Sequence, residues 1–109
     1  GSFPRLATKR VQLEISGLVF YIRLMRYYVY ILYSQSRDRY YIGYSINPEE
    51  RLVEHNLGAT TSTRTGRPWR LVYTEEFENK SAAIKRETTI KRMKSRKYVE
   101  TLINSNSTG

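Results

Sequence analysis

Two tyrosine-rich apolar runs lie close together in the first half of the chain. Tyr27–Ser34 and Tyr40–Ser45 are rich in Tyr, Val and Ile, residue types that favour strands. The link between them, residues 35–39, is polar and contains a Ser-Arg-Asp turn signal. Parallel strands need a crossover of about a dozen residues or more, so this short link indicates an antiparallel hairpin.

A helix start follows the hairpin. The motif Asn47-Pro48-Glu49-Glu50 combines an N-cap residue, a proline at the first helical position and a capping-box carboxylate. We expect the helix to run to Leu57 and to end at Gly58. Leu52 and Val53 are the residues expected to form its buried side.

The second half of the chain predicts one more strand and two more helices. A basic loop at 59–68 is expected to lead into a strand at 69–77. Asn79 or Ser81 then caps a helix that runs to about residue 94. After a break at 95–97 we expect a short helix at 98–104 and a frayed tail at 105–109. The element order β-β-α-β-α-α predicts an α+β fold. Its three strands form an antiparallel or mixed sheet whose faces are covered by helices.

The first part of the chain lacks this patterning. Gly1-Ser2 resembles a cleavage scar, and strong patterning begins only after Met25, a candidate native start. We therefore expect residues 1–24 to be a loose or weakly packed appendage and residues 25–104 to be the domain. The alternative is an extra strand at 11–22, which contains Val, Ile and Phe.

The composition limits the chemistry. The 109 residues contain no cysteine and one histidine, His55, which excludes disulfide-linked partners, thiolate nucleophiles and zinc sites rich in His or Cys. A metal ion would need oxygen ligands, which favours Mg²⁺ or Mn²⁺. The net charge of +9 indicates a polyanionic partner such as nucleic acid. The apolar stretch 15–24 is too short to span a bilayer.

Glu87 has an unusual position on the long helix. The apolar arc consists of Ala83, Ile84, Ile90 and Met93, and Glu87 falls inside it. A carboxylate that faces the core needs a metal ion or an arginine as partner. A surface glutamate at the edge of the arc, paired with Arg86 or Lys91, fits the same spacing.

Two further pairs of residues allow either chemistry or ordinary structure. Arg51 and His55 share a helix face, where they could clamp a phosphate and move a proton, or form a solvated polar face. Tyr30 and Tyr41 lie on neighbouring strands, and Gly43 shares the face of Tyr41. This pattern fits close approach by a ligand, and it equally fits cross-strand aromatic packing.

Basic residues cluster in the loop and near the end of the long helix. Such side chains either contact phosphates or form a solvated surface. The candidates for nucleic-acid binding are Arg64, Arg67, Arg70, Lys91 and Lys94.

Taken in order along the chain, these motifs resemble the GIY-YIG nuclease family. The motifs are Tyr28-Val29-Tyr30-Ile31-Leu32, Tyr41-Ile42-Gly43, Glu50-Arg51-Leu52-x-x-His55-Asn56, Leu71-Val72-Tyr73 and Ala83-Ile84-Lys85-Arg86-Glu87. The resemblance covers roughly residues 26–104. It looks closest to small stand-alone bacterial members, which resemble the nuclease domain of the excision-repair subunit UvrC.

The resemblance implies a three-stranded antiparallel sheet and a cytoplasmic endonuclease that hydrolyses phosphodiester bonds in DNA with one Mg²⁺ or Mn²⁺ ion. DNA repair or processing of unusual DNA structures is the role implied by analogy. The matching positions make Tyr30, Tyr41, Arg51 and His55 catalytic and Glu87 the metal ligand. Tyr30 and Tyr41 are then expected to point into one cleft on which Arg51 and Glu87 converge. Asn104 is a candidate to support Glu87.

The chain departs from the family pattern at two positions. Tyr28-Val29-Tyr30 stands where the family name has Gly-Ile-Tyr, and Tyr44 follows Gly43 where some active members have lysine. The second departure keeps open a catalytically silent nucleic-acid-binding module on the same fold. A protein-interaction domain is a third hypothesis, and the sequence leaves the oligomeric state open.

Overall fold

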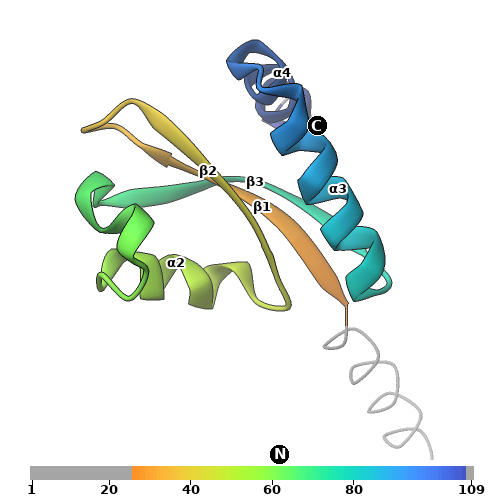
Figure 1. Cartoon of the computed structure of the whole chain (residues 1–109), viewed down its shortest axis with the longest axis horizontal. Helices are drawn as coiled ribbons and strands as arrows, with labels where there is room; N and C mark the ends of the chain where they lie inside the picture. Colours follow the sequence, from red (N-terminus) through yellow and green to blue (C-terminus); the bar gives the residue numbers. More distant parts are fainter. Residues whose placement is uncertain (1–25, 108–109) are drawn as a thin grey trace, which may run out of the picture.

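The computed structural model describes residues 26–107 (Figure 1). The expected appendage at 1–24, with its alternative strand, lies outside the described residues.

Three antiparallel strands form the sheet in the order β2-β1-β3. They are β1 (Tyr27–Ser34), β2 (Arg39–Ser45) and β3 (Trp69–Phe77). The hairpin register places Tyr30 opposite Gly43 and Leu32 opposite Tyr41. The predicted hairpin and third strand are confirmed, and the sheet is antiparallel throughout.

Asparagine side chains start two of the three α-helices found within residues 26–107. The helices are α2 (Pro48–Asn56), α3 (Lys80–Met93) and α4 (Arg96–Ser107). The side-chain oxygen of Asn47 accepts from the Glu50 amide at 3.2 Å, and that of Asn79 accepts from the Ala82 amide at 2.8 Å. Both interactions satisfy backbone donors that a helix N-terminus leaves free.

Two segments differ from the sequence prediction. A short 3₁₀ helix, η1 (Thr61–Gly66), lies inside the expected basic loop. Helix α4 begins at Arg96 and continues to Ser107, so the prediction of a frayed tail from residue 105 is wrong for residues 105–107. In both segments polar Ser, Thr and Asn residues hide the helical pattern, because they also favour turns.

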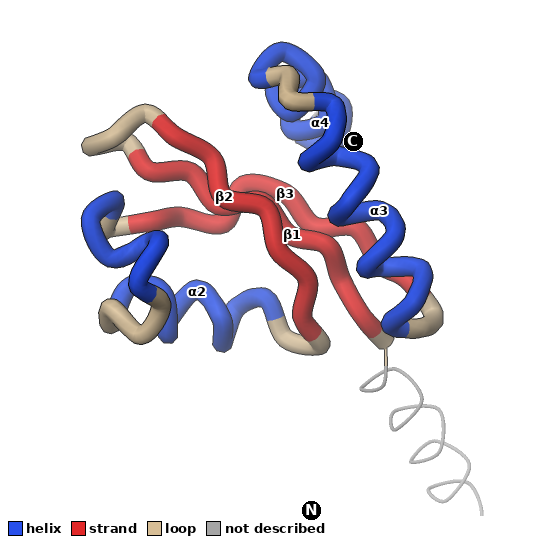
Figure 2. The backbone as a smooth tube through the Cα atoms, viewed as in Figure 1, coloured by secondary structure: helices blue, strands red, loops and turns tan. Residues whose placement is uncertain are grey.

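The helices cover opposite faces of the sheet, with α2 on one side and α3 and α4 on the other (Figure 2). Alternate residues of β1 supply both cores, as a strand requires. Val29 and Ile31 pack with Ala83, Ile90 and Val99 on the α3–α4 side. On the α2 side, the buried cluster consists of Tyr30, Leu32 and Trp69.

Several side chains on the helices are placed differently from the sequence prediction. Val53 is 57% exposed, so its expected burial is wrong, and His55 is fully buried instead. On α3, Ile84 and Met93 are exposed, which reduces the buried arc to Ala83 and Ile90. Among residues 26–107, no helix is long and apolar enough to cross a membrane.

Candidate active site

Tyr30 projects from the middle of β1 and is 1% exposed. Its ring lies over Gly43 of the neighbouring strand. A Cβ atom on Gly43 would lie 2.7 Å from the Tyr30 hydroxyl oxygen, closer than real side-chain contacts allow. Glycine at this position therefore gives the Tyr30 hydroxyl room beside β2.

A buried hydrogen-bond chain continues from Tyr30 through His55 to Thr63. The Tyr30 hydroxyl oxygen lies 3.2 Å from His55 Nε2, and His55 Nδ1 lies 2.7 Å from Thr63 Oγ1. The Thr63 hydroxyl donates to the Thr60 carbonyl at 3.3 Å, so it must accept from Nδ1–H. His55 therefore carries its proton on Nδ1, and Nε2 accepts from the Tyr30 hydroxyl.

Burial determines the protonation states of His55 and Tyr30 at neutral pH. It lowers the pKa of His55 below its ordinary value, assisted by the positive charge of Arg51, so the imidazole is neutral at pH 7. Burial also raises the pKa of Tyr30 above its ordinary value. Interaction with Arg51 opposes this rise, while electrostatic interactions with Tyr41 and with the Glu87 carboxylate add to it.

Arg51 lies one helical turn before His55 on α2, on the face that approaches Tyr30. Its hydrogen bond with Tyr30 is the main cause of its raised pKa, with a smaller contribution from Glu54, while burial acts in the opposite direction. Arg51 also forms an ion pair with Glu54. The guanidinium therefore interacts with both Tyr30 and Glu54 and stays charged.

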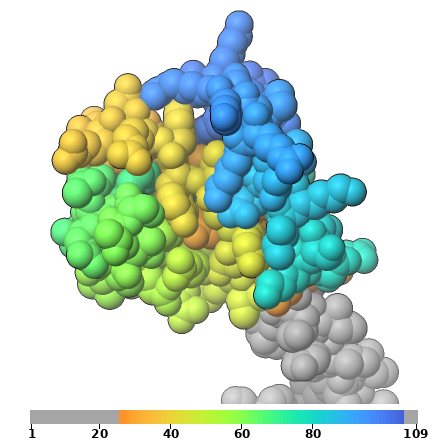
Figure 3. Space-filling view, viewed as in Figure 1, coloured from red at the N-terminus to blue at the C-terminus, as the bar shows by residue number. Residues whose placement is uncertain are grey.

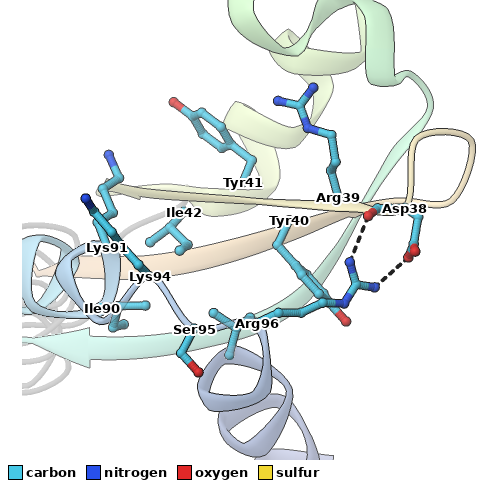
Figure 4. Close-up of a pocket in the computed structure, with 11 residues that line it drawn as sticks. Asp38, Arg39, Tyr40, Tyr41, Ile42, Ile90, Lys91, Lys94, Ser95 and Arg96 are labelled. Atoms are coloured by element: carbon cyan, nitrogen blue, oxygen red, sulfur yellow. Dashed lines mark hydrogen bonds and ion pairs between the residues drawn. The ribbon is translucent and has the colours of Figure 1, made fainter.

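Tyr41 completes an aromatic group around His55. Its ring centroid lies 4.8 Å from that of His55, 6.3 Å from that of Tyr30 and 6.4 Å from that of Trp69. Its hydroxyl makes no hydrogen bond with residues 26–107 and points away from β2 in Figure 4. Tyr41 therefore combines a packed ring with a hydroxyl that is available to a ligand.

Glu87 lies on α3 between the buried residues Ala83 and Ile90, with its side chain 14% exposed. Its carboxylate accepts from Lys91 Nζ at 3.2 Å, whereas Arg86 pairs with Glu75 instead. Of the two partners suggested by the sequence, Lys91 is thus the one found. The negative charge of Glu87 contributes, as the smallest of the effects on that residue, to the raised pKa of Tyr30.

The site residues therefore come together in two groups. Tyr30, Tyr41 and His55 pack against one another on the α2 side, and the charge of Arg51 acts on both Tyr30 and His55. Glu87 acts on Tyr30 through its charge, and among the described residues its carboxylate pairs with Lys91 rather than with any of these four side chains. Asn104, expected beside Glu87, lies on an exposed part of α4.

The oxygen donor that Glu87 supplies suits a hard cation such as Mg²⁺. Within residues 26–107 no group of three or more His, Cys, Asp or Glu side chains could hold a metal ion. Glu87 supplies a single shielded carboxylate. Mg²⁺ commonly binds through one or two carboxylates and keeps several water molecules, so this donor set is compatible with it.

A groove of about 430 Å³ opens between β2 and the corner where α3 meets α4 (Figures 3 and 4). Tyr41 and Arg39 lie on its β2 side, and Lys91 and Lys94 lie on its helix side. Its acidic lining residue, Asp38, is neutralised by an ion pair with Arg96. The groove therefore presents a cationic surface next to Tyr41.

The remaining expected DNA-binding residues lie elsewhere. Arg64 and Arg67 line a second groove beside η1, and Arg70 of β3 lies over the Tyr33 ring, 5.5 Å from its centroid. The predicted basic residues thus divide between two grooves and one exposed strand position.

Thr63 is a site residue that the sequence did not indicate. It lies in the segment expected to be a loop, where no periodicity distinguishes a buried threonine from its exposed neighbours. Its contact with His55 depends on how η1 packs against α2 and could not be inferred from spacing along the chain.

The chain resembles small proteins of bacteria and archaea. It is 46% identical over 66 residues to the UPF0213 protein of Natronomonas pharaonis, covering 60% of this chain and 76% of that one. It is 42% identical over 69 residues to the UPF0213 protein of Staphylococcus haemolyticus, covering 62% and 83% respectively.

A solution NMR structure of the UPF0213 protein from Bacillus halodurans matches with 34% identity and a TM-score of 0.47, covering 73% of this chain and 84% of that one. The GIY-YIG catalytic domain matches residues 26–99, which include the three strands, α2, α3 and all five candidate site residues. The chain therefore belongs to the GIY-YIG family.

Proposed function

We propose that the chain is a divalent-metal-dependent endonuclease that hydrolyses phosphodiester bonds in DNA. The observation that carries this proposal is the hydrogen-bond chain from Tyr30 through His55 to Thr63, with the charge of Arg51 acting on the same tyrosine. A core that needed only packing would not require a buried neutral imidazole with its acceptor nitrogen directed at a tyrosine.

The hydrogen-bond chain offers a route for the proton of the attacking water. The raised pKa of Tyr30 means that a standing tyrosinate is not populated at pH 7. Instead, Tyr30 passes its hydroxyl proton to His55 Nε2 while it accepts a proton from the water. The water oxygen bonds to phosphorus, the bond to the leaving oxygen breaks, and solvent protonates that oxygen.

Thr63 and Arg51 assist this transfer in different ways. Thr63 holds the His55 proton on Nδ1, which keeps Nε2 free to accept. Arg51 can donate to a non-bridging phosphate oxygen and stabilise the charge that grows in the transition state. The free hydroxyl of Tyr41 orients the water or the phosphate.

Glu87 is the proposed ligand of one Mg²⁺ or Mn²⁺ ion, as family members generally use a divalent metal. When bound, such an ion supplies neutralisation of the phosphate and stabilisation of the leaving oxygen. The low exposure of Glu87 favours this role, because a shielded carboxylate needs a cationic partner.

The proposed substrate is DNA, and the proposed role is repair or processing of unusual DNA structures. The net charge of +9 supports a nucleic-acid partner, and basic residues line both grooves. Backbone contacts of this kind carry no sequence information.

A cleavage panel tests the proposal. Plasmid, branched and single-stranded DNA are incubated with Mg²⁺, Mn²⁺ or EDTA and with the wild type, Glu87→Gln or His55→Gln. We expect metal-dependent cleavage by the wild type and a loss of about 100-fold or more in each variant. A Glu87→Gln protein that cleaves at the wild-type rate with Mg²⁺ would contradict the scheme.

A catalytically silent DNA-binding module is the second candidate. The ion pair between Lys91 and Glu87 favours it, because the lysine satisfies the carboxylate without a metal ion. Binding to the same DNA panel without nicking in any metal would select this alternative.

A further inference from the structure

A second basic groove, of about 690 Å³, lies beside η1 and the turn between β1 and β2. It falls in the size range of about 300–1,000 Å³ typical of ligand sites. Its described lining residues include three arginines and no acidic residue. They are Arg37, Asn56, Arg64, Thr65, Arg67 and Pro68.

All three arginines are anchored in the same way, through Nε to a backbone carbonyl. Arg37 donates to the Thr65 carbonyl at 3.4 Å, Arg64 to that of Gly58 at 3.0 Å, and Arg67 to that of Arg64 at 2.7 Å. Their terminal NH₂ groups make no hydrogen bond or ion pair with residues 26–107. A guanidinium held by Nε still presents terminal donors, and these suit phosphate oxygens.

The frame that carries these arginines is fixed by further hydrogen bonds between the turn and η1. The Ser34 hydroxyl donates to the Gly66 carbonyl at 2.6 Å, and the Ser36 hydroxyl donates to the Arg67 carbonyl at 3.5 Å. Gly58 has a φ of +86°, and a Cβ there would lie 2.9 Å from Arg67 Nη1. The guanidiniums are therefore preorganised rather than free to choose any rotamer.

Among residues 26–107, no carboxylate forms an ion pair with the three arginines of the groove. Asp38, the acidic neighbour of Arg37 in sequence, is engaged by Arg96 and by the Tyr33 hydroxyl. Arginines anchored around one groove repel one another, and a bound anion would relieve that repulsion. A solvated patch of long, freely moving side chains would not need their Nε atoms tied to carbonyls.

The groove is also joined to the candidate active site. Asn56, which lines it, follows His55, and its side chain bonds both the amide and the carbonyl of Trp69. Thr63 of η1 accepts from His55 Nδ1. An anion held beside η1 would therefore have a fixed position relative to the Tyr30–His55 pair.

We propose that this groove is a phosphate clamp, in which Arg37, Arg64 and Arg67 bind backbone phosphates of the DNA strand away from the scissile phosphate. The inference rests on the proposed function for the identity of the nucleic acid. It makes Arg37 a DNA-binding residue and gives Arg64 and Arg67 a shared site. Arg70 has no part in the clamp.

Binding of a fluorescent duplex and a fluorescent single strand, measured by anisotropy in EDTA across a salt series, tests the clamp. The variant carries Arg37→Gln, Arg64→Gln and Arg67→Gln. A matched control loses three exposed positive charges from α3 through Lys80→Gln, Lys85→Gln and Arg92→Gln. Because binding in EDTA does not require cleavage, a failure of the nuclease proposal leaves this result interpretable.

We expect the clamp variant to bind about tenfold or more weakly at 0.1 M salt, with the slope of log K against log salt smaller by about 2–3. The control is expected to retain most of the affinity. Equal losses in the two variants would overturn the clamp. Anionic vesicles provide a further arm, and clamp-dependent binding to vesicles but not to DNA would also overturn it.

A milder variant guards against loss of folding in the triple variant. Arg37→Lys keeps the charge in an exposed turn but removes the guanidinium fork. We expect about a threefold or larger loss of DNA affinity with an unchanged melting temperature. In the wild type, the Nε–H NMR signals of the three arginines should shift on addition of a short oligonucleotide, and unshifted signals at saturation would contradict the proposal.

Discussion

The Tyr30 hydroxyl donates to His55 Nε2 across 3.2 Å, joining the central strand to a helix 25 residues further along the chain. The lowered pKa of His55 keeps the imidazole ready to accept a proton at neutral pH. Protonation at lower pH would remove the acceptor and place a charge in a fully buried site.

The pH dependence of cleavage follows from this pair. Because the pKa of His55 is lowered, we expect kcat to hold at pH 7 and to fall only as the pH drops below about 6.5, the ordinary histidine value. Cleavage rates at saturating DNA from pH 5 to pH 8 check this. A rate that is already falling between pH 8 and pH 7 would contradict a neutral His55.

Stability should follow the same residue. The unfolded chain binds a proton to His55 at a higher pH than the folded chain does, so the stability contribution is complete above about 6.5 and is lost as the pH falls towards the lower folded-state pKa. Urea unfolding of the wild type and His55→Gln from pH 5 to pH 8 should show this difference in slope. Parallel curves would exclude the linkage.

Thr63→Val is expected to lower kcat more than it changes KM. Valine fills a similar space but cannot accept from His55 Nδ1, which leaves a buried donor unsatisfied at a cost of about 1–3 kcal/mol. The imidazole is then free to change tautomer, and Nε2 no longer has to accept from Tyr30. Thr63→Ser keeps the hydroxyl and should restore most of kcat. Equal rates in the valine and serine variants would argue against this positioning role.

Gly43→Ala is expected to destabilise the fold by about 1–3 kcal/mol and to displace the Tyr30 hydroxyl, because the added methyl overlaps that ring. A double-mutant cycle with Tyr30→Ala isolates the overlap. If the same alanine at position 43 destabilises the Tyr30→Ala protein equally, the penalty has another origin. Urea denaturation of the four proteins provides the measurement.

The parts of the fold that the sequence predicts are those with local causes. The hairpin follows from two β-favouring runs around a short polar link, and the starts of α2 and α3 follow from Asn47 and Asn79 as caps. The position of Glu87 on the buried side of α3 also follows from helical spacing.

Features set by contacts between distant elements could not be predicted in this way. The spacing of Arg51 and His55 suggested a shared polar face, yet His55 is buried because Tyr30 and Thr63 satisfy both ring nitrogens. Val53 is exposed although its hydrophobicity predicted burial. Helix periodicity ranks side chains by polarity, and it does not show which polar groups find partners in the folded chain.

Lys91→Gln is expected to increase the affinity of the protein for Mn²⁺. The ammonium of Lys91 holds the Glu87 carboxylate at 3.2 Å and competes with a cation for it. Lys91 is half exposed, so solvent screens the pair, and its loss should tighten Mn²⁺ binding by only about two- to fivefold.

Lys94→Gln is the matched control, because Lys94 lines the same groove without pairing to Glu87. Calorimetric titration with Mn²⁺ separates the two variants. Equal affinities would mean that Glu87 does not bind the metal or that Lys91 does not restrain it, and the Glu87→Gln titration distinguishes these two cases.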